Sequence, residues 1–203
     1  MTSANPTASG TPSAAAKPVL VAYETRFGST AEVARAIGAV LAEAGFAAEI
    51  RRASEVDDPT RYAAVIVGAP VYSRRWLRAA CAWVRLHRDA LAPRPVWFFA
   101  LGIRVPDGPH ANERHTLRLL RRLHQLAPDF EPRSIGLFAG AVNPAIVGLR
   151  EQIQLRVFRP KTGDFRDWAK IRAWAMAVRD ELRSAASPPC DERPRAAQSS
   201  SDR

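Results

Sequence analysis

The sequence has no long uninterrupted run of apolar residues, and it contains only two cysteines. A membrane-spanning helix needs about 20 consecutive apolar residues, and no stretch of this chain approaches that composition. No segment resembles a secretory leader. Cys81 and Cys190 have no metal-ligand spacing and no evident reason to pair. We therefore expect a reducing, cytoplasmic setting, because disulfides are rare there.

Histidine is also scarce. The four histidines are His87, His110, His115 and His124. They lie on or near basic, polar segments and lack the spacing of metal ligands. The sequence therefore predicts no metal site and no catalytic residue of the protein's own. Redox chemistry, if the chain performs any, has to be supplied by a bound cofactor that the protein positions.

Lysine is nearly absent, although the formal net charge is +10. Lys17, Lys161 and Lys170 are the three lysines, so arginine carries the positive charge. One interpretation is a surface for nucleic acid or an anionic membrane. The other is a composition bias spread over solvated helix faces. We favour the second and consider nucleic acid an unlikely partner, since net charge reports on association and solubility and not on fold.

The two ends of the chain differ in composition from the rest. Residues 1–16 and 186–203 are rich in Ser, Ala and Pro and have few large apolar side chains. Such segments bury too little apolar surface to fold. We expect disorder at both ends and a single domain over residues 17–185.

Within that domain, strand and helix patterns alternate. Apolar runs typical of buried strands occur at 19–23, 63–68, 96–101 and 134–139, and a half-buried alternating run at 46–50. Helical spacing is found at 33–44, 76–91, 112–127 and in two stretches after residue 140. This alternation predicts an α/β fold with a parallel sheet and helices on both faces.

The last helical stretch begins near Gly163. We expect Asp164 to cap it and Asp167 to lie near its start, where a negative charge is favourable. Its apolar residues at helical spacing predict the side that is buried: Phe165, Trp168, Ile171, Trp174, Val178 and Leu182.

The first strand leads into a polar loop followed at once by a helix. The loop reads Thr25-Arg26-Phe27-Gly28-Ser29-Thr30. Three hydroxyl groups, the backbone N–H groups beside Gly28 and the positive end of the helix dipole point to a bound anion such as a phosphate monoester. An equally weighted alternative is an ordinary turn in which Ser29 or Thr30 caps the helix.

This loop resembles the phosphate loop of flavodoxins, which binds the phosphate of FMN. The resemblance covers about residues 18–185 and implies a doubly wound sheet of five parallel strands in the order 2-1-3-4-5. Phe27 stands where flavodoxins usually carry a hydroxyl. One phosphate hydrogen bond should therefore be missing, and the charge of Arg26 is expected to compensate.

Two further loops carry the same resemblance. Gly68-Ala69-Pro70-Val71-Tyr72 matches the loop whose small residues approach the flavin, and Tyr72 is the expected stacking residue. Trp76 is expected to be a core residue instead. The loop with Gly102, Ile103 and Arg104 would face the ring's other side. Arg74, Arg75 and Arg104 make this rim basic, and positive charge near the flavin N1 raises its reduction potential.

The first loop also has the form Tyr-x-Thr-Arg-x-Gly-x-Thr, matched by Tyr23, Thr25, Arg26, Gly28 and Thr30. This form, with the last helix, is similar to flavodoxin-domain proteins related to menaquinone-dependent protoporphyrinogen dehydrogenase. The resemblance implies an FMN-dependent electron-transfer protein whose partner is a redox protein or a quinone.

Two alternatives to that function are kept. One is a regulatory or interaction module of the same fold that binds FMN weakly or not at all, as Phe27 suggests. The other is a nucleic-acid-binding protein, which only the charge favours. Residues 145–159 combine apolar and arginine residues, which fits either a helix covering the sheet, the favoured reading, or a peripheral contact with the inner face of a membrane.

Overall fold

The computed structural model describes residues 17–72, 75–102, 121, 131–142 and 163–186. Its main sheet contains β1 (Val19–Tyr23), β2 (Ala48–Arg52), β3 (Ala64–Tyr72), β4 (Arg75–Trp76), β5 (Val96–Gly102) and β6 (Ile135–Ala139). The longer helices are α1 (Ser29–Glu43), α2 (Arg78–Leu86) and α6 (Trp168–Ala186), and α3 (Arg88–Leu91) is a single turn. Two 3₁₀ turns, Ala53–Glu55 and Pro59–Arg61, connect β2 to β3. A small ribbon pairs β7 (Ala141–Val142) with β8 (Gly163–Asp164).

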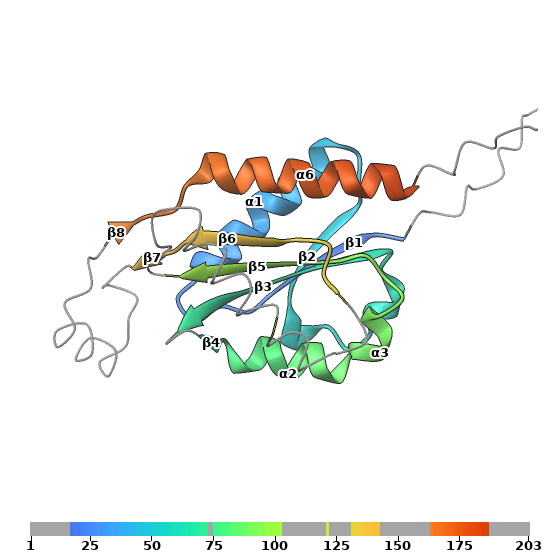
Figure 1. Ribbon diagram of the computed structural model, residues 1–203, viewed down its shortest axis with the longest axis horizontal. Helices are drawn as coiled ribbons and strands as arrows, with labels where there is room; N and C mark the ends of the chain where they lie inside the picture. The colour runs from blue at the N-terminus through green and yellow to red at the C-terminus, as the bar shows by residue number, and fades with distance from the viewer. Residues whose placement is uncertain (1–16, 73–74, 103–120, 122–130, 143–162, 187–203) are drawn as a thin grey trace, which may run out of the picture.

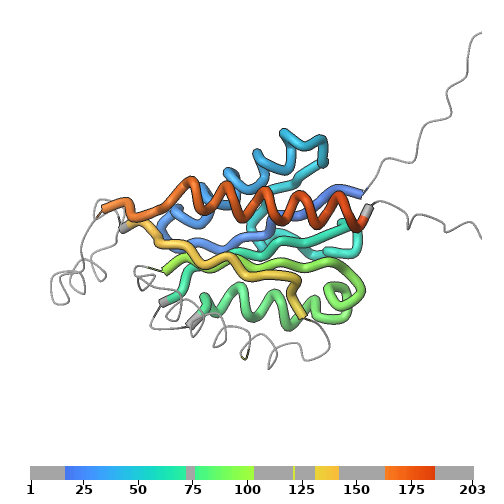
Figure 2. Tube along the Cα trace, turned by 45° about the horizontal axis from the view of Figure 1, so that its top comes forward, coloured from blue at the N-terminus to red at the C-terminus, as the bar shows by residue number. Residues whose placement is uncertain are grey.

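Five parallel strands lie in the order β2-β1-β3-β5-β6, and the short β4 pairs antiparallel with the end of β3. Counted without β4, this is the predicted order 2-1-3-4-5, which is confirmed. Helices α1 and α6 cover one face of the sheet, and α2 and α3 cover the other (Figure 1). A second view also shows α1 and α6 side by side on their face (Figure 2). The expected helices on both faces are thus present.

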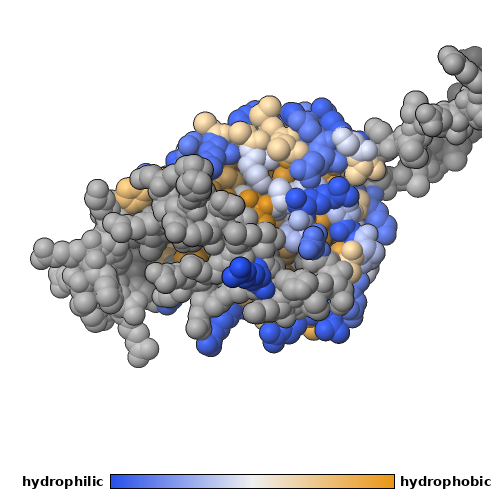
Figure 3. Space-filling view, viewed as in Figure 1, coloured by the Kyte–Doolittle hydropathy of each residue, from blue (hydrophilic) through white to orange (hydrophobic). Residues whose placement is uncertain are grey.

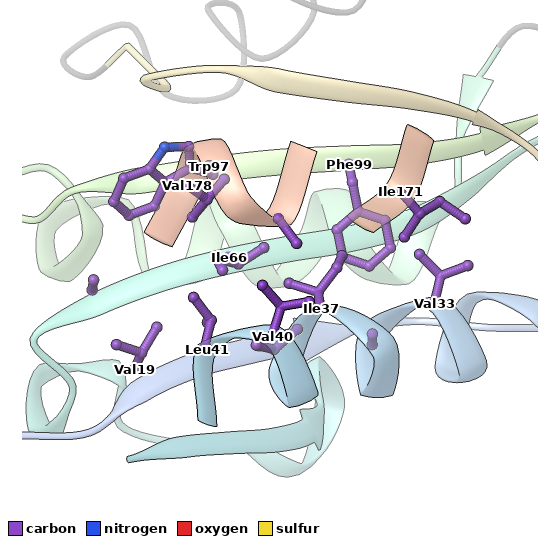
Figure 4. Close-up of a cluster of buried hydrophobic side chains, with 14 of the residues drawn as sticks. Val19, Val33, Ile37, Val40, Leu41, Ile66, Trp97, Phe99, Ile171 and Val178 are labelled. Atoms are coloured by element: carbon purple, nitrogen blue, oxygen red, sulfur yellow. The ribbon is translucent and has the colours of Figure 1, made fainter. Parts of the chain in front are cut away.

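Each central strand contributes alternate side chains to two separate cores, because successive residues of a strand point to opposite faces. The core under α1 and α6 includes Val19, Ile66, Trp97 and Phe99 (Figure 4). The core over α2 and α3 takes Leu20, Val67, Phe98 and Trp83. Burial on both faces explains why these strands read as continuous apolar runs.

Two buried tryptophans direct their indole N–H groups to polar partners, as buried tryptophans require. Trp97 Nε1 donates to Glu181 Oε2 of α6 at 2.8 Å, which ties the C-terminal helix to the middle of the sheet. Trp76 Nε1 donates to the carbonyl oxygen of Ala69 at 3.0 Å. Trp76 is therefore a core residue, as expected, but it lies in β4, and the helix begins two residues later at Arg78.

The start of α6 differs from the sequence-based prediction. Asp164 belongs to β8, and the helix begins at Trp168. The cap is Asp167, whose Oδ1 accepts from the backbone N–H of Lys170 at 3.0 Å. The prediction that Phe165 and Trp168 are buried is also wrong, since they are 40% and 43% exposed. They precede the part of the helix that contacts the sheet, where Ile171, Val178 and Leu182 are buried as expected.

Several predictions fall on segments outside the described residues. These are the helix expected over 112–127, the amphipathic segment at 145–159, and nearly all of the two expected disordered ends. Among the described helices, none is both long enough and apolar enough to span a membrane.

Gly68 occupies a position in β3 where no side chain fits. A Cβ atom there would lie 1.9 Å from Cζ of Phe99, the residue opposite it in β5. Phe99 is fully buried and has Phe138 and Trp174 beside it, with ring centroids 6.4 and 6.3 Å away. The Phe99 ring therefore fills the space that a side chain at position 68 would need.

Gly68→Ala should destabilise the protein by about 3 kcal/mol, the upper part of the usual range for an overpacked core. Chemical denaturation of the ligand-free protein measures this change. Gly140→Ala is the matched control, because its Cβ would meet no described atom closer than 3.5 Å. The double variant Gly68→Ala/Phe99→Leu should recover part of the loss, since the two sites contact each other. An equally destabilising Gly140→Ala would contradict the explanation.

Candidate functional site

The ends of three neighbouring parallel strands meet at one edge of the sheet. Tyr23, the last residue of β1, lies opposite Gly68 of β3, and the next residue, Glu24, donates its backbone N–H to the Gly68 carbonyl at 2.8 Å. At its far end β3 pairs with β5, where Val71 lies opposite Gly102. The structure thus brings the first loop, the described part of the second loop and the first residue of the third to one edge of the sheet, beside the place where strand order reverses between β1 and β3.

The first loop, residues 25–30, leads directly into α1. Gly28 precedes the helix with φ of +88°, a left-handed conformation that glycine adopts without strain. Its backbone N–H donates to the Thr25 hydroxyl at 2.9 Å, which closes the turn. The alternative in which Ser29 or Thr30 caps the helix is wrong, since Gly28 holds that position and no side chain caps the helix there.

The start of α1 has the features of an anion site. The first N–H groups of a helix have no partner within the helix, and the helix dipole adds positive potential there. The backbone N–H groups of Ser29 and Thr30, the first two residues of α1, are among these groups. No described atom lies within 4 Å of the position where a Cβ of Gly28 would be, so space is open beside the turn.

The Thr30 hydroxyl is a second observation that fits a ligand at the helix start; among the described residues, the other buried side-chain atom without a partner is Trp174 Nε1 in α6. Thr30 is fully buried, and its Oγ1 atom has no hydrogen-bond partner among the described residues. A buried polar group without a partner costs about 1–3 kcal/mol and is rare in native structures. A phosphate oxygen at the helix start would accept a hydrogen bond from it. The residues present therefore fit a phosphate group.

Arg26 and Phe27 form the outer side of the loop. Arg26 is exposed, and its guanidinium carbon lies 5.4 Å from the centre of the Phe27 ring. This is the geometry of a cation–π contact. Arg26 thus places a positive charge on the outer side of the loop, and the compensation expected of it stays a prediction.

The second loop is built into the sheet. Ala69, Pro70, Val71 and Tyr72 are the last residues of β3, and the Ala69 side chain is buried in the core over α2. The backbone N–H of Leu77 donates to the Pro70 carbonyl at 3.1 Å. Any contact of Ala69 with a ligand has to come from its backbone. The side chain of Tyr72 is outside the described residues, so its stacking role stays a prediction.

The third loop is described only at its start. Gly102 ends β5, and its carbonyl accepts from the Gly140 N–H at 2.7 Å. Ile103 and Arg104 lie outside the described residues, as do Arg74 and the side chain of Arg75. The basic rim predicted for this edge therefore also stays a prediction.

Sequence reasoning missed two groups of residues at this edge. Glu24 is only 5% exposed, and its Oε1 accepts from the Ser54 backbone N–H at 2.9 Å, which joins the phosphate loop to the turn after β2. Arg166 bridges Asp164 and Glu32, which lies in the first turn of α1. The role of Glu24 could have been found from the sequence, because it is a charged residue directly after a run typical of a buried strand. The role of Arg166 could not, because its partner Glu32 is 134 residues away.

Hydrophilic residues of the described part are scattered between apolar ones on the face that Figure 3 shows. Several arginines of this part pair with acids, among them Arg166 with Glu32 and Arg172 with Glu43. No group of His, Cys, Asp and Glu suited to a metal ion occurs within the described ranges.

A pair of threonine variants tests whether the two hydroxyls of the loop differ as the structure indicates. Thr30→Val keeps the shape and removes an unpartnered hydroxyl, so it should stabilise the ligand-free protein by about 1 kcal/mol. Thr25→Val removes the acceptor of the Gly28 N–H and should destabilise it by about 1 kcal/mol. Denaturant unfolding of the two variants gives both values. Equal changes in both would show that Thr30 is satisfied within the protein.

Comparison with known proteins agrees with this arrangement. The model of the flavodoxin domain family matches residues 20–168. No curated protein of known function is detectably similar in sequence. A short-chain flavodoxin associated with a non-canonical PDU bacterial microcompartment superposes with a TM-score of 0.53 at 11% identity, over 84% of this chain and 99% of that one.

Two other solved structures share the fold. Flavodoxin from Fusobacterium nucleatum, solved with bound flavin mononucleotide, has a TM-score of 0.50 and 15% identity over 81% of this chain and 98% of that one. The Flv1 flavodiiron core from Synechocystis has a TM-score of 0.54 and 13% identity. That match covers 85% of this chain but 37% of the Flv1 chain, so it concerns one part of a larger protein. With the family model matching most of its length, the chain belongs to the flavodoxin domain family.

Proposed function

We propose that this protein binds one FMN noncovalently and transfers electrons. The observation that carries the proposal is the buried, unpartnered hydroxyl of Thr30 at the start of α1. It lies at the sheet edge where a doubly wound fold binds its ligand. Membership of the flavodoxin domain family and the FMN-bound flavodoxin of the same fold support FMN as that ligand.

In this proposal each loop has its own task. Gly28, Ser29 and Thr30 hold the phosphate through backbone N–H groups and hydroxyls, and Arg26 adds positive charge. The backbone from Gly68 to Tyr72 lies along one side of the ring, and Gly102, Ile103 and Arg104 lie along the other. The bound flavin supplies the electron-transfer chemistry, while the protein supplies binding, orientation and electrostatics.

The electron partner is a finer part of the proposal. The form Tyr23-x-Thr25-Arg26-x-Gly28-x-Thr30 supports a quinone-linked dehydrogenase acting on protoporphyrinogen, with a redox partner protein as the alternative. A quinone partner would bring the protein, from the cytoplasmic side, into peripheral contact with a membrane. Anaerobic reduction of the flavin-loaded protein, followed by mixing with a soluble menaquinone analogue, tests this step. Failure of the quinone to reoxidise the flavin would rule it out.

Phe27 favours a second candidate function. Its ring, in contact with Arg26, occupies the loop position where flavodoxins usually carry a phosphate-binding hydroxyl. A chain with one hydrogen bond fewer would bind FMN weakly and could serve as a regulatory or interaction module with the same fold. Binding of FMN with micromolar or tighter affinity would exclude this function as the main one.

The full-length protein should quench FMN fluorescence with a stoichiometry near one per chain. Thr30→Val should raise the Kd for FMN about 10- to 100-fold, because a hydrogen bond to a charged group is worth about 1.5–3 kcal/mol. Affinity for riboflavin, which lacks the phosphate, should not change. Thr60→Val is the control, since its hydroxyl donates to Asp58 and is remote in sequence from the loop. An equal loss of FMN and riboflavin affinity would show that the phosphate loop is misassigned.

A further inference from the structure

Arg166 is held in place from several directions. Its Nε and Nη2 atoms donate to the two carboxylate oxygens of Asp164 at 2.8 and 2.6 Å. Its Nη1 atom donates to Glu32 Oε2 at 2.8 Å. The guanidinium carbon also lies 4.5 Å from the centre of the Trp168 ring. Although it lies in the connection between β8 and α6, the Arg166 side chain is only 8% exposed.

This arrangement holds the guanidinium in a single orientation. The two-pronged hydrogen bond with Asp164 raises the pKa of Arg166, and the same bond lowers the pKa of Asp164. A planar guanidinium gripped by a carboxylate and stacked on an aromatic ring loses little further freedom when it contacts a third group. Arg166 therefore presents a preset positive charge to Glu32.

Glu32 lies beside the proposed phosphate site. It is three residues after Ser29, so the two side chains share a helix face, with about 5–6 Å between their Cβ atoms. The Glu32 backbone N–H donates to the Gly28 carbonyl at 3.3 Å, which places it in the same turn. A carboxylate in the first turn stabilises a helix, but here an unpaired one would repel a phosphate dianion.

We propose that Arg166, oriented by Asp164, is a positioning residue for the phosphate of the flavin cofactor, acting by offsetting the negative charge of Glu32 at the start of α1. This inference rests on the proposed FMN site and concerns only its phosphate half. The charge of Arg166 allows the helix to keep a stabilising acid in its first turn while the same turn binds an anion. Affinity for the phosphate group, and not for the ring, should then depend on a residue near the C-terminal helix.

The structure contains a matched control for this idea. Arg172 of α6 pairs with Glu43 of α1 at 2.7 Å, so it also joins the C-terminal part of the chain to α1. Glu43 is the last residue of α1, at the end opposite the first loop. Removing Arg172 breaks an ion pair to the same helix α1 without exposing a charge beside the site.

The test measures Kd values for FMN and riboflavin by fluorescence quenching of the full-length protein. Arg166→Gln should raise the Kd for FMN about tenfold and leave that for riboflavin within twofold. The double variant Arg166→Gln/Glu32→Gln should return FMN affinity to within about threefold of the parent, because it removes the repelling carboxylate. Arg172→Gln should change neither Kd. Thermal unfolding of each ligand-free variant shows whether it is folded.

Three results would overturn the inference. If Arg166→Gln binds FMN like the parent, or loses FMN and riboflavin affinity equally, Arg166 does not act on the phosphate. If the double variant stays as weak as Arg166→Gln, the effect is not charge neutralisation at Glu32. A parent protein that binds neither flavin would refute the FMN site itself, and this inference with it. A parent that binds both flavins while Arg166→Gln is unchanged refutes the inference alone.

Discussion

The parallel pairing of β1 with β3 is the constraint on which the site depends. Tyr23 ends β1 opposite Gly68, and the N–H of Glu24 donates to the Gly68 carbonyl before the chain turns into the phosphate loop. β3 continues to Tyr72, along β5 on one side and β4 on the other. Because β3 extends beyond the end of β1, the difference in their lengths determines where α1 begins relative to the second loop. A shift of one residue in this register would turn the side chains of β1 to the opposite faces of the sheet.

Much of this architecture could be predicted from the sequence because the signals are local. Runs such as 63–68 and 96–101 predict strands buried on both faces, and the alternation with helices predicts the parallel sheet. The cap of α6 was assigned to the wrong residue, since Asp164 and Asp167 are both suitable and only the pairing of β8 with β7 places Asp164 outside the helix. Phe165 and Trp168 lie at the helical spacing of the apolar residues, but this spacing does not show which part of the segment contacts the sheet.

The candidate site was predictable in its position but less so in its chemistry. The glycines at 28 and 68 illustrate the difference. Gly28 has a positive φ, as a tight turn before a helix requires. The resemblance implies a close approach of flavin at Gly68, which stays a prediction, and the structure adds a second constraint, since the buried Phe99 ring leaves no room for a side chain there. Sequence alone does not reveal this, because the constraint arises from a residue 31 positions away on the neighbouring strand.

The start of α1 combines two opposing electrostatic demands. An acid such as Glu32 in the first turn stabilises the helix, and an anion site in that turn favours neutral or positive groups. The structure meets both through Arg166, which contacts Glu32 at 2.8 Å and is itself oriented by Asp164. The loop's own arginine, Arg26, is exposed and lies over Phe27 instead. The ion pair between Arg166 and Glu32 therefore links the C-terminal part of the chain to the charge in the first turn of α1.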